Sequence, residues 1–183
     1  IQRSRGLGDV YKRQLKELVS RYGKEEIKQF IEDWFNYSEK RMIEAIKKLP
    51  SGTVSKTTVY DPMEPTLPVG LPINVSVEID PENAKIEVDL TKNEDSKEFG
   101  LNESVACATS NALCGVFNCI DSDVPHNAGS FKRVSVKLRE GCVTGIPEFP
   151  MSCSMATTNI GDRIVNATQA AFAEFGKGYG LAE

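Results

Sequence analysis

The sequence predicts an α+β fold in which long amphipathic helices pack on a small mixed sheet. Apolar residues alternate with polar ones over residues 73–79 and again over 84–90, as they do in an antiparallel hairpin with one face in water. Two other stretches, 24–49 and 159–175, place apolar residues three or four positions apart, which is the spacing of one buried helix face. We therefore expect both helices to pack on a sheet that includes the hairpin.

The first residues do not resemble the rest of the chain. Residues 4–14 read SRGLGDVYKRQ, which is one reading frame of a widely used sequencing-library adapter. We interpret residues 1–14 as a non-biological addition and leave them out of the fold prediction. Because the chain has no initiator Met and ends abruptly at Glu183, we expect residues 15–183 to be an internal fragment of a larger subunit.

Two helices are predicted on either side of Gly23. A short apolar stripe precedes this glycine: Leu15, Leu18, Val19 and Tyr22. A longer helix is expected over Lys24–Leu49 and is ended by Pro50-Ser51-Gly52; its apolar face contains Ile27, Phe30, Ile31, Trp34, Phe35, Met42, Ala45, Ile46 and Leu49. Such an aromatic stripe could bind a planar cofactor, but amphipathic stripes generally face the interior, and we expect core packing.

A first strand is predicted over Thr53–Tyr60, which is rich in Thr and Val. Four prolines then form a stiff connection that cannot lie inside a sheet: Pro62, Pro65, Pro68 and Pro72. In the hairpin, three carboxylates alternate with the apolar positions: Glu78, Glu87 and Asp89. We interpret them as a solvated face rather than an acid/base pair, because charged side chains are rarely buried.

The second half of the chain is expected to add two helices and a strand. Asn102 is suited to cap a helix that runs to about Cys119, with these residues inward: Val105, Ala112, Leu113, Val116, Phe117 and Ile120. Alternating apolar residues predict a strand over 134–138. The last helix is expected to begin with Asn159 as its cap and to end at Gly176.

Composition limits the partners. The chain has 183 residues, 40% of them hydrophobic and 26% charged, which fits one globular domain or part of a larger one. A net charge of −4 argues against nucleic-acid or anionic-membrane binding, which both need a basic face. No apolar run approaches the roughly 18 to 20 residues of a membrane span, and the N-terminus lacks a signal-peptide core. We expect a cytoplasmic protein with small-molecule or protein partners.

The five cysteines are an odd number without a CxxC pair, and we interpret them as reduced thiols rather than a disulfide framework or a zinc site. They are Cys107, Cys114, Cys119, Cys142 and Cys153. Cys107 and Cys114 lie seven positions apart on a predicted helix and are expected to be half-buried core residues. Metal binding and nucleophilic catalysis are the alternatives.

Most candidate site residues lie in Pro125–Arg133. His126 is the only histidine of the chain, and its imidazole could act as a general base near neutral pH; an exposed or turn-stabilising histidine is the interpretation that we favour. Asn127 and Ser130 could hydrogen-bond a ligand or form an Asx or Ser turn, and both interpretations stay open. A P-loop, GxSxG, HExxH or DxDxDG pattern is absent from the sequence. A single histidine also excludes a multi-histidine metal site within this chain.

Several short motifs follow one another in a distinctive order. They are Tyr37-Ser38-Glu39-Lys40-Arg41-Met42 with Leu49-Pro50-Ser51-Gly52, then Val88-Asp89-Leu90, Gly100-Leu101-Asn102, Pro125–Arg133, Gly145–Pro150, Ser152–Asn159 and Gly178–Glu183. In this order they resemble the hydantoinase B/oxoprolinase family, and the resemblance covers essentially all of Leu15–Glu183.

The resemblance implies a middle fragment of a B-type subunit similar to N-methylhydantoinase B and related to the acetone carboxylase alpha subunit. Such subunits act with a hydantoinase A-like ATP-binding partner in the ATP-dependent opening of cyclic amides such as hydantoins and 5-oxoproline, and relatives carboxylate ketones. ATP on the partner and a divalent metal are expected for the complex. No cofactor is expected within this fragment, because the family's metal-binding His and Asp residues belong to its N-terminal part.

Two hypotheses stay open at this point. In the first, the chain is an enzyme fragment that carries Asn102, Asn127, Gly129 and Ser130 near the cavity that binds a small cyclic amide. In the second, it is a non-catalytic scaffold segment whose surfaces hold the ATP-dependent partner subunit. A concave site around the polar loop favours the first hypothesis, and a flat surface favours the second.

Overall fold

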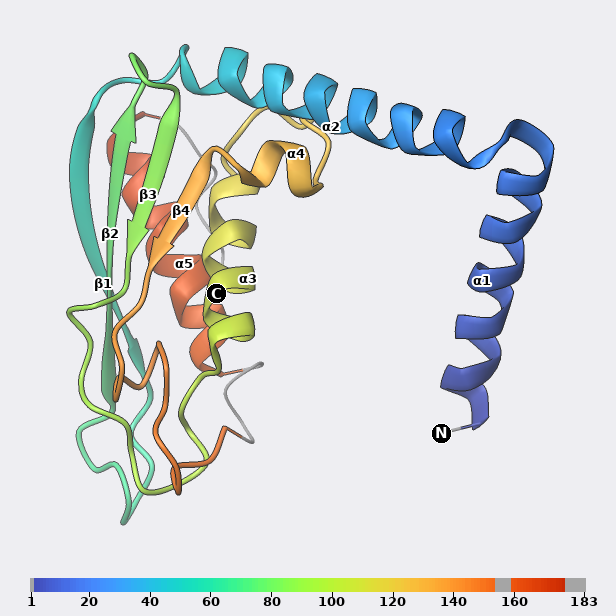
Figure 1. The fold of residues 1–183 in the computed structure, drawn as a ribbon. Helices are drawn as coiled ribbons and strands as arrows, with labels where there is room; N and C mark the ends of the chain where they lie inside the picture. Colours follow the sequence, from blue (N-terminus) through green and yellow to red (C-terminus); the bar gives the residue numbers. More distant parts are fainter. Residues whose placement is uncertain (1, 154–158, 177–183) are drawn as a thin grey trace.

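The computed structural model describes residues 2–153 and 159–176. In chain order the elements are α1 (Gln2–Tyr22), α2 (Lys24–Ile46), β1 (Gly52–Tyr60), β2 (Leu71–Asp80), β3 (Lys85–Asp89), α3 (Val105–Phe117), α4 (Ala128–Phe131), β4 (Val134–Lys137) and α5 (Ile160–Glu174). The body has two layers, a four-stranded sheet and the helices α3 and α5 on one of its faces (Figure 1). The predicted α+β fold is confirmed.

The sheet is mixed, and its strand order β1-β2-β3-β4 follows the chain. β1 pairs antiparallel with β2, and β2 pairs antiparallel with β3 as the predicted hairpin, with Val77 opposite Val88. β4 is added parallel to β3, which is possible because the chain first passes through α3 and α4.

The inward residues of β2 form the centre of the core. Each is at most 1% exposed: Leu71, Ile73, Val75, Val77 and Ile79. α5 covers β1 and β2, and α3 packs on α5. The two helices approach closely at Gly115, where a Cβ would lie only 2.6 Å from the Cβ of Thr168. The inward face predicted for the last helix is confirmed by the buried Ile160, Ile164 and Phe172.

The opposite face of the sheet is polar. The hydroxyl of Ser55 donates to that of Ser76 over 3.0 Å, and Lys137 pairs with Glu87 at 2.5 Å. The three predicted carboxylates all lie here and are at least partly exposed: Glu78, Glu87 and Asp89. The prediction of a solvated face is therefore confirmed.

Pro72 corrects one expectation, because it lies inside β2 rather than in the connection before it. It pairs with Val59 of β1, whereas β3 pairs only with residues 76–80 of β2. Asn74, two positions on, directs its N–H to the side chain of Asn93. An N–H at position 72 would point to this same side, beyond the end of β3, so proline removes no ladder hydrogen bond.

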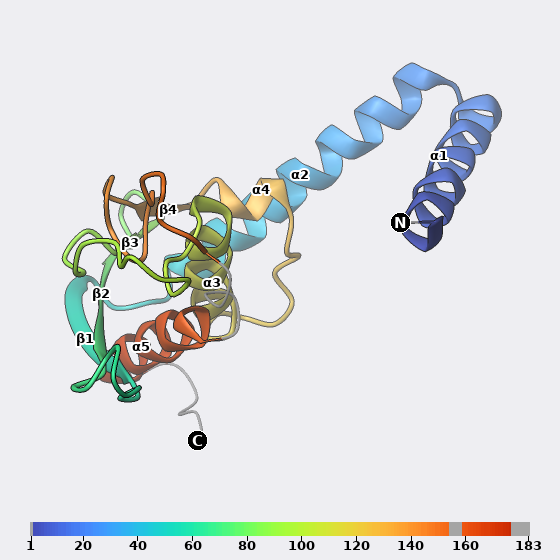
Figure 2. The ribbon, with the colours of Figure 1, turned by 90° about the horizontal axis from the view of Figure 1, so that it is seen from below.

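The buried face predicted for α2 is wrong over the first half of the helix. Phe30, Ile31 and Trp34 are 66%, 42% and 46% exposed, whereas Met42, Ala45 and Ile46 near the helix end are buried. The reason is that this half, together with α1, projects away from the body (Figures 1 and 2). We call α1, Gly23 and residues 24–34 the arm.

The cap predicted for α3 is wrong, whereas Asn159 stands at the predicted cap position of α5 but does not cap it through its side chain. α3 begins at Val105, and its cap is Ser104, whose Oγ accepts a hydrogen bond from the N–H of Cys107 over 3.3 Å. Val105 is 46% exposed rather than inward, because the helix starts later than Asn102 predicted. Among the described residues, the side chain of Asn159 makes no capping hydrogen bond to α5 and donates instead to the hydroxyl of Tyr60 over 3.2 Å.

All five cysteines are free thiols. Cys107 is half-buried as expected, but Cys114 is exposed, because it lies outside the buried face of α3, which contains Ala108, Ala112 and Val116. None of the helices in the described part of the chain is long and apolar enough to cross a membrane.

Deletion of residues 1–14 is expected to leave the rest of the fold unchanged, because residues 8–14 of α1 are all exposed to solvent. The melting temperature, followed by circular dichroism, should move by less than about 4 °C, the shift that about 1 kcal/mol produces at this size. A larger loss of melting temperature would show that the adapter-like segment contributes to stability.

Candidate functional site

The loop that carries the candidate residues is closed by its own polar side chains. Asn127 caps α4, since its Oδ1 accepts a hydrogen bond from the N–H of Gly129 over 2.8 Å. The Oγ of Ser130 accepts from the N–H of Asn127 over 3.3 Å and donates to the carbonyl of Pro125 over 2.6 Å. Both residues therefore form the Asx and Ser turns that the sequence left open.

This loop is docked on α2 by a close backbone contact. A Cβ on Gly129 would overlap the carbonyl of Phe35, so only glycine allows the approach. Beside this contact, the amide Nδ2 of Asn127 donates to the Oγ of Ser38 over 2.8 Å. Ser38 in turn donates to the carbonyl of Trp34 over 2.8 Å. The loop thus binds the middle of α2, around Phe35 and Ser38, through backbone and side chains together.

Charged residues strengthen the same junction. Glu39 pairs with Lys132 at 3.1 Å and with Arg133 at 2.5 Å. The Lys132 ammonium, followed by the Arg133 guanidinium, lowers the pKa of the Glu39 carboxyl. Sequence reasoning missed this junction, although Ser38 and Glu39 belong to one of the quoted motifs and the loop to another.

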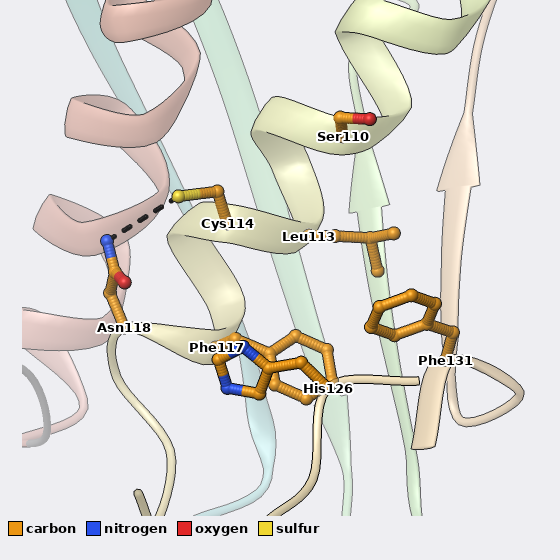
Figure 3. Close-up of a pocket in the computed structure, with 7 residues that line it drawn as sticks. All are labelled: Ser110, Leu113, Cys114, Phe117, Asn118, His126 and Phe131. Atoms are coloured by element: carbon orange, nitrogen blue, oxygen red, sulfur yellow. Dashed lines mark hydrogen bonds between the residues drawn. The ribbon is translucent and has the colours of Figure 1, made fainter. Parts of the chain in front are cut away.

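His126 lies at the edge of an apolar hollow of about 310 Å³ (Figure 3). The residues that line it are Ser110, Leu113, Cys114, Phe117, Asn118, His126 and Phe131. We call it the His126 hollow. The imidazole packs edge-on against Phe117 with ring centroids 4.5 Å apart, and Phe117 contacts Phe131 at 5.3 Å.

The chemistry of the His126 hollow is limited but specific. Its apolar lining residues Leu113, Phe117 and Phe131 suit a small apolar group, and the other lining residues supply polar groups. Among these, the Nδ2 of Asn118 donates to the Sγ of Cys114 over 3.7 Å. No carboxylate is among the described residues that line the hollow, so His126 has no acidic partner there to orient it as in a triad.

Asn102 lies away from the loop. Its buried side chain accepts from the N–H of Lys97 over 2.6 Å and donates to the carbonyls of Phe99 and Ser152 over 3.1 and 2.9 Å. The 13 residues of α3, about 20 Å of helix, separate Asn102 from Asn127. The structure therefore brings Asn127, Gly129 and Ser130 together and leaves Asn102 at the other end of α3.

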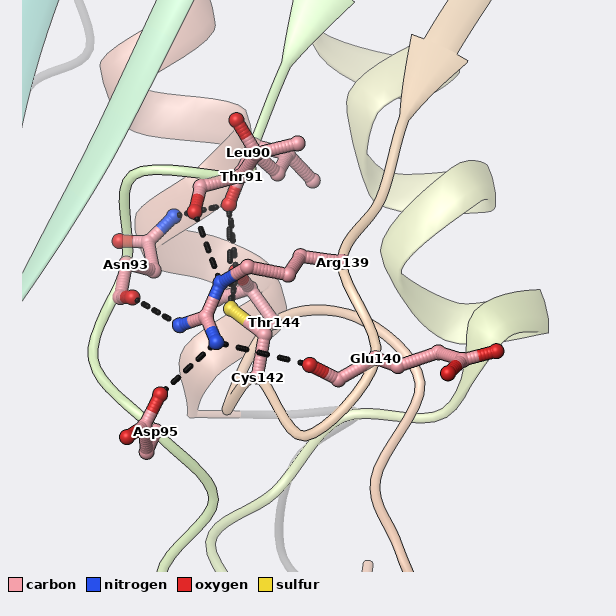
Figure 4. A network of polar contacts seen from close by, with 8 residues as sticks. All are labelled: Leu90, Thr91, Asn93, Asp95, Arg139, Glu140, Cys142 and Thr144. Carbon is pink, nitrogen blue, oxygen red and sulfur yellow. Dashed lines mark hydrogen bonds and ion pairs between the residues drawn. The ribbon is translucent and has the colours of Figure 1, made fainter.

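A network around Arg139 fixes the loops near Asn102 (Figure 4). The guanidinium donates to the carbonyls of Thr91 and Asn93 over 3.1 and 2.8 Å and pairs with Asp95 at 2.8 Å. The hydroxyl of Thr144 donates to the carbonyl of Leu90 over 3.3 Å. These contacts join the charged loop after β3 to the turn after β4.

Glu103 is a buried acid that sequence reasoning missed. Its side chain is fully buried, and its Oε1 accepts from the Nδ2 of Asn111 over 2.5 Å, whereas Oε2 has no hydrogen-bond partner among the described residues. Burial raises the pKa of this carboxyl to about 7. At the start of α5, a Cβ on Gly161 would collide with Asn111 and lie 3.0 Å from Glu103. No periodic signal in the sequence distinguishes Glu103 from surface acids.

The described residues form no cluster of metal ligands. Within residues 2–153 and 159–176, no three side chains of His, Cys, Asp or Glu lie close enough together to hold a metal ion. The described residues therefore do not fit the divalent metal expected for a full complex, and we derive no step through it.

The chain is similar in sequence to a known protein family. The sequence model described as Hydantoinase B/oxoprolinase matches residues 8–180. No curated protein sequence matches the chain. Of the motifs quoted for the resemblance, residues 154–158 and Gly178–Glu183 lie outside the described residues.

Two solved structures share the fold. The ATP-dependent caprolactamase from Pseudomonas jessenii superposes with a TM-score of 0.80 and 21% identity, over 91% of this chain and 28% of that chain. Acetone carboxylase, in a nucleotide-free structure concerned with ATP-dependent acetone carboxylation, superposes with a TM-score of 0.62 and 14% identity, over 88% of this chain and 23% of that chain. The chain thus spans about a quarter of the length of each.

Replacement of Glu103 by Gln is expected to stabilise the protein at pH 8 much more than at pH 5. The folded-state pKa of about 7 lies above the ordinary value of 4.5, so the folded state holds the proton more tightly. The stability of the parent is therefore highest below the unfolded-state pKa and falls as the pH rises from about 4.5 to 7, by on the order of 3 kcal/mol in all. Gln has no charge to bury and keeps an oxygen that can accept from Asn111.

Urea unfolding of both proteins at several pH values measures this difference. Glu98→Gln, a change to an exposed acid of the preceding loop, serves as the control and should leave the pH dependence of the parent unchanged. Equal pH dependence in the parent and Glu103→Gln would contradict the raised pKa.

Proposed function

Because the chain belongs to the hydantoinase B/oxoprolinase family, as its motifs predicted, we propose that it is a portion of the B-type subunit of an ATP-dependent enzyme that opens cyclic amides, such as hydantoins or 5-oxoproline. The observation that carries this proposal is the match of the family model over residues 8–180. The fold shared with an ATP-dependent caprolactamase supports it, since caprolactam is itself a cyclic amide.

ATP is assigned to a separate hydantoinase A-like subunit. The sequence lacks a phosphate-binding loop. Of three hollows in the described residues, two are largely apolar and the third is formed by hydrogen-bonded sheet residues. In this proposal the partner uses ATP to activate the substrate, and the B-type subunit completes the hydrolysis in the cytoplasm. A divalent metal would belong to parts of the complex other than the described residues.

Within this portion we assign the substrate-facing role to the His126 hollow and its loop. The hollow is concave and largely apolar, as small-molecule sites generally are, and His126 stands at its edge. Asn127, Gly129 and Ser130 would position His126 by closing the loop and docking it on α2. Asn102 would act separately, by holding the backbone at Ser152.

Two alternative functions are each supported by a specific observation. Carboxylation of a ketone is supported by the fold shared with acetone carboxylase, although the TM-score is lower than for the caprolactamase. A scaffold role is supported by the use of Asn127 and Ser130 in hydrogen bonds within the fold. Turnover of a lactam, a hydantoin and a ketone by the same assembled complex distinguishes these candidates.

The 183-residue chain by itself is expected to show no hydrolysis of cyclic amides and no ATPase activity. It has no sequence pattern for nucleotide binding, and its described residues contain no group of His, Cys, Asp or Glu side chains that could hold a water-activating metal ion. Steady-state assays of hydantoin, 5-oxoproline and caprolactam with ATP test this expectation. Robust turnover by the isolated chain would overturn the proposal that it is a portion of a larger enzyme.

In a complete B-type subunit assembled with its ATP-binding partner, Asn127→Ala is expected to lower turnover by roughly tenfold or more. Loss of one positioning hydrogen bond of about 1 to 3 kcal/mol has an effect of this order. The matched control is Ser38→Ala, which removes the same Ser38–Asn127 contact from the other side but leaves the amide and the cap. Steady-state kinetics should show a clearly smaller effect for the control.

Melting curves of both variants accompany the kinetics. Unchanged turnover in folded Asn127→Ala would show that Asn127 has no role in the site. Equal losses in both variants would show that the contact with α2, rather than the amide of Asn127, matters.

A further inference from the structure

The arm carries an apolar face that nothing in the described chain covers. Phe30 and Ile31 lie one helical turn before Trp34 on α2, and the three side chains are 42% to 66% exposed. On α1, Leu15, Leu18 and Tyr22 are 44% to 55% exposed. A contiguous exposed apolar surface of this kind generally marks an interaction site.

The two helices enclose a hollow of about 490 Å³ where they meet at Gly23. It is lined by Leu15, Leu18, Tyr22, Glu26, Ile27, Phe30 and Ile31. All of these residues follow the adapter-like segment. Glu26 is the only charged residue among them, so the complementary surface must be apolar, with a basic group opposite Glu26. Trp34 stacks on Tyr37 at 5.5 Å and extends the apolar face toward the body.

The arm belongs to the fold that this chain shares with larger proteins. The family model begins at residue 8, within α1. The superpositions cover 91% and 88% of the chain, which is more than residues 35–183 could supply by themselves. At least part of the arm is therefore included in the regions aligned with two chains of which this fold occupies only 28% and 23%.

We propose that the apolar face of the arm, from Leu15 to Trp34, is the docking surface for a further part of the same B-type subunit. This rests on the proposal that the chain is a portion of such a subunit. The occupant is an apolar surface with a Lys or Arg opposite Glu26. The same subunit is favoured over a second copy because about three quarters of each superposed chain lies outside the shared fold, and a covalently linked segment is present at high effective concentration.

The test compares the isolated chain with a chimera in which residues 15–183 replace the superposed portion of the caprolactamase subunit. Phe30→Glu puts a charge on the apolar face, and Glu32→Arg, on the opposite side of α2, is the matched control. In the isolated chain neither substitution should change the melting temperature, because both side chains are exposed. In the chimera Phe30→Glu should lower it by several degrees, while Glu32→Arg leaves it unchanged.

Hydroxyl-radical footprinting gives an independent measurement of side-chain exposure. Trp34 is the only tryptophan of the chain, and its oxidation, with that of Phe30 and Tyr22, should be severalfold slower in the chimera than in the isolated chain. Phe149, which is 99% exposed and lies outside the arm, is the reference. Equal oxidation of Trp34 in both proteins would overturn the proposal.

Other results would assign the apolar face of the arm to a different partner. A concentration-dependent dimer of the isolated chain that Phe30→Glu abolishes would assign the face to a second copy and overturn the proposal. Protection of Trp34 only after the ATP-binding partner is added would do the same. If the chimera fails to fold, a Glu substitution in the caprolactamase subunit itself, at the position superposed on Phe30, takes its place, and an unchanged melting temperature there would count against the proposal.

Turnover of the chimera is recorded separately. A folded but inactive chimera with a protected arm supports the docking surface and counts against the proposed function. An active chimera with an exposed arm does the reverse.

Discussion

The contact between Gly129 and α2 is the one on which the rest of this structure depends. At this point the backbone of the polar loop touches the backbone of Phe35 so closely that no side chain fits. The Ser38–Asn127 hydrogen bond joins residues 89 positions apart, and the Glu39 ion pairs lie beside it. Because α2 carries the arm, this junction also determines the direction in which the arm leaves the body (Figure 1).

The junction changes how the polar loop is understood. Asn127 and Ser130 direct their hydrogen-bonding groups into the fold, so in the proposed site they would act on a ligand only through the position of His126 at the edge of the hollow. The Gly129 contact, the Asn127 cap and the two ion pairs of Glu39 fix the loop. The exposed imidazole of His126 therefore lies against Phe117. Rigid placement of a side chain by its neighbours is what a binding site requires.

Elsewhere in the body, the fold contains one electrostatically unfavourable group, the buried carboxyl of Glu103. Glu103 is buried between α3 and α5 with one oxygen unpartnered among the described residues, and burial of a charged carboxylate is strongly unfavourable. The carboxyl adjusts by holding its proton to higher pH. The surrounding core of β2, α3 and α5 is extensive enough for the fold to accommodate one such group.

The sequence by itself determined the elements that depend on neighbours along the chain. Alternation predicted the hairpin, three-four spacing predicted α2 and α5, and the ordered motifs predicted the family. Only the tertiary structure decided which part of the α2 stripe is buried, that Ser104 rather than Asn102 caps α3, and that Glu103 lies in the interior. It also decided that Ser38 and Asn127 meet. Periodicity reports which residues share a face, whereas burial and pairing depend on residues far away in sequence that reach that face.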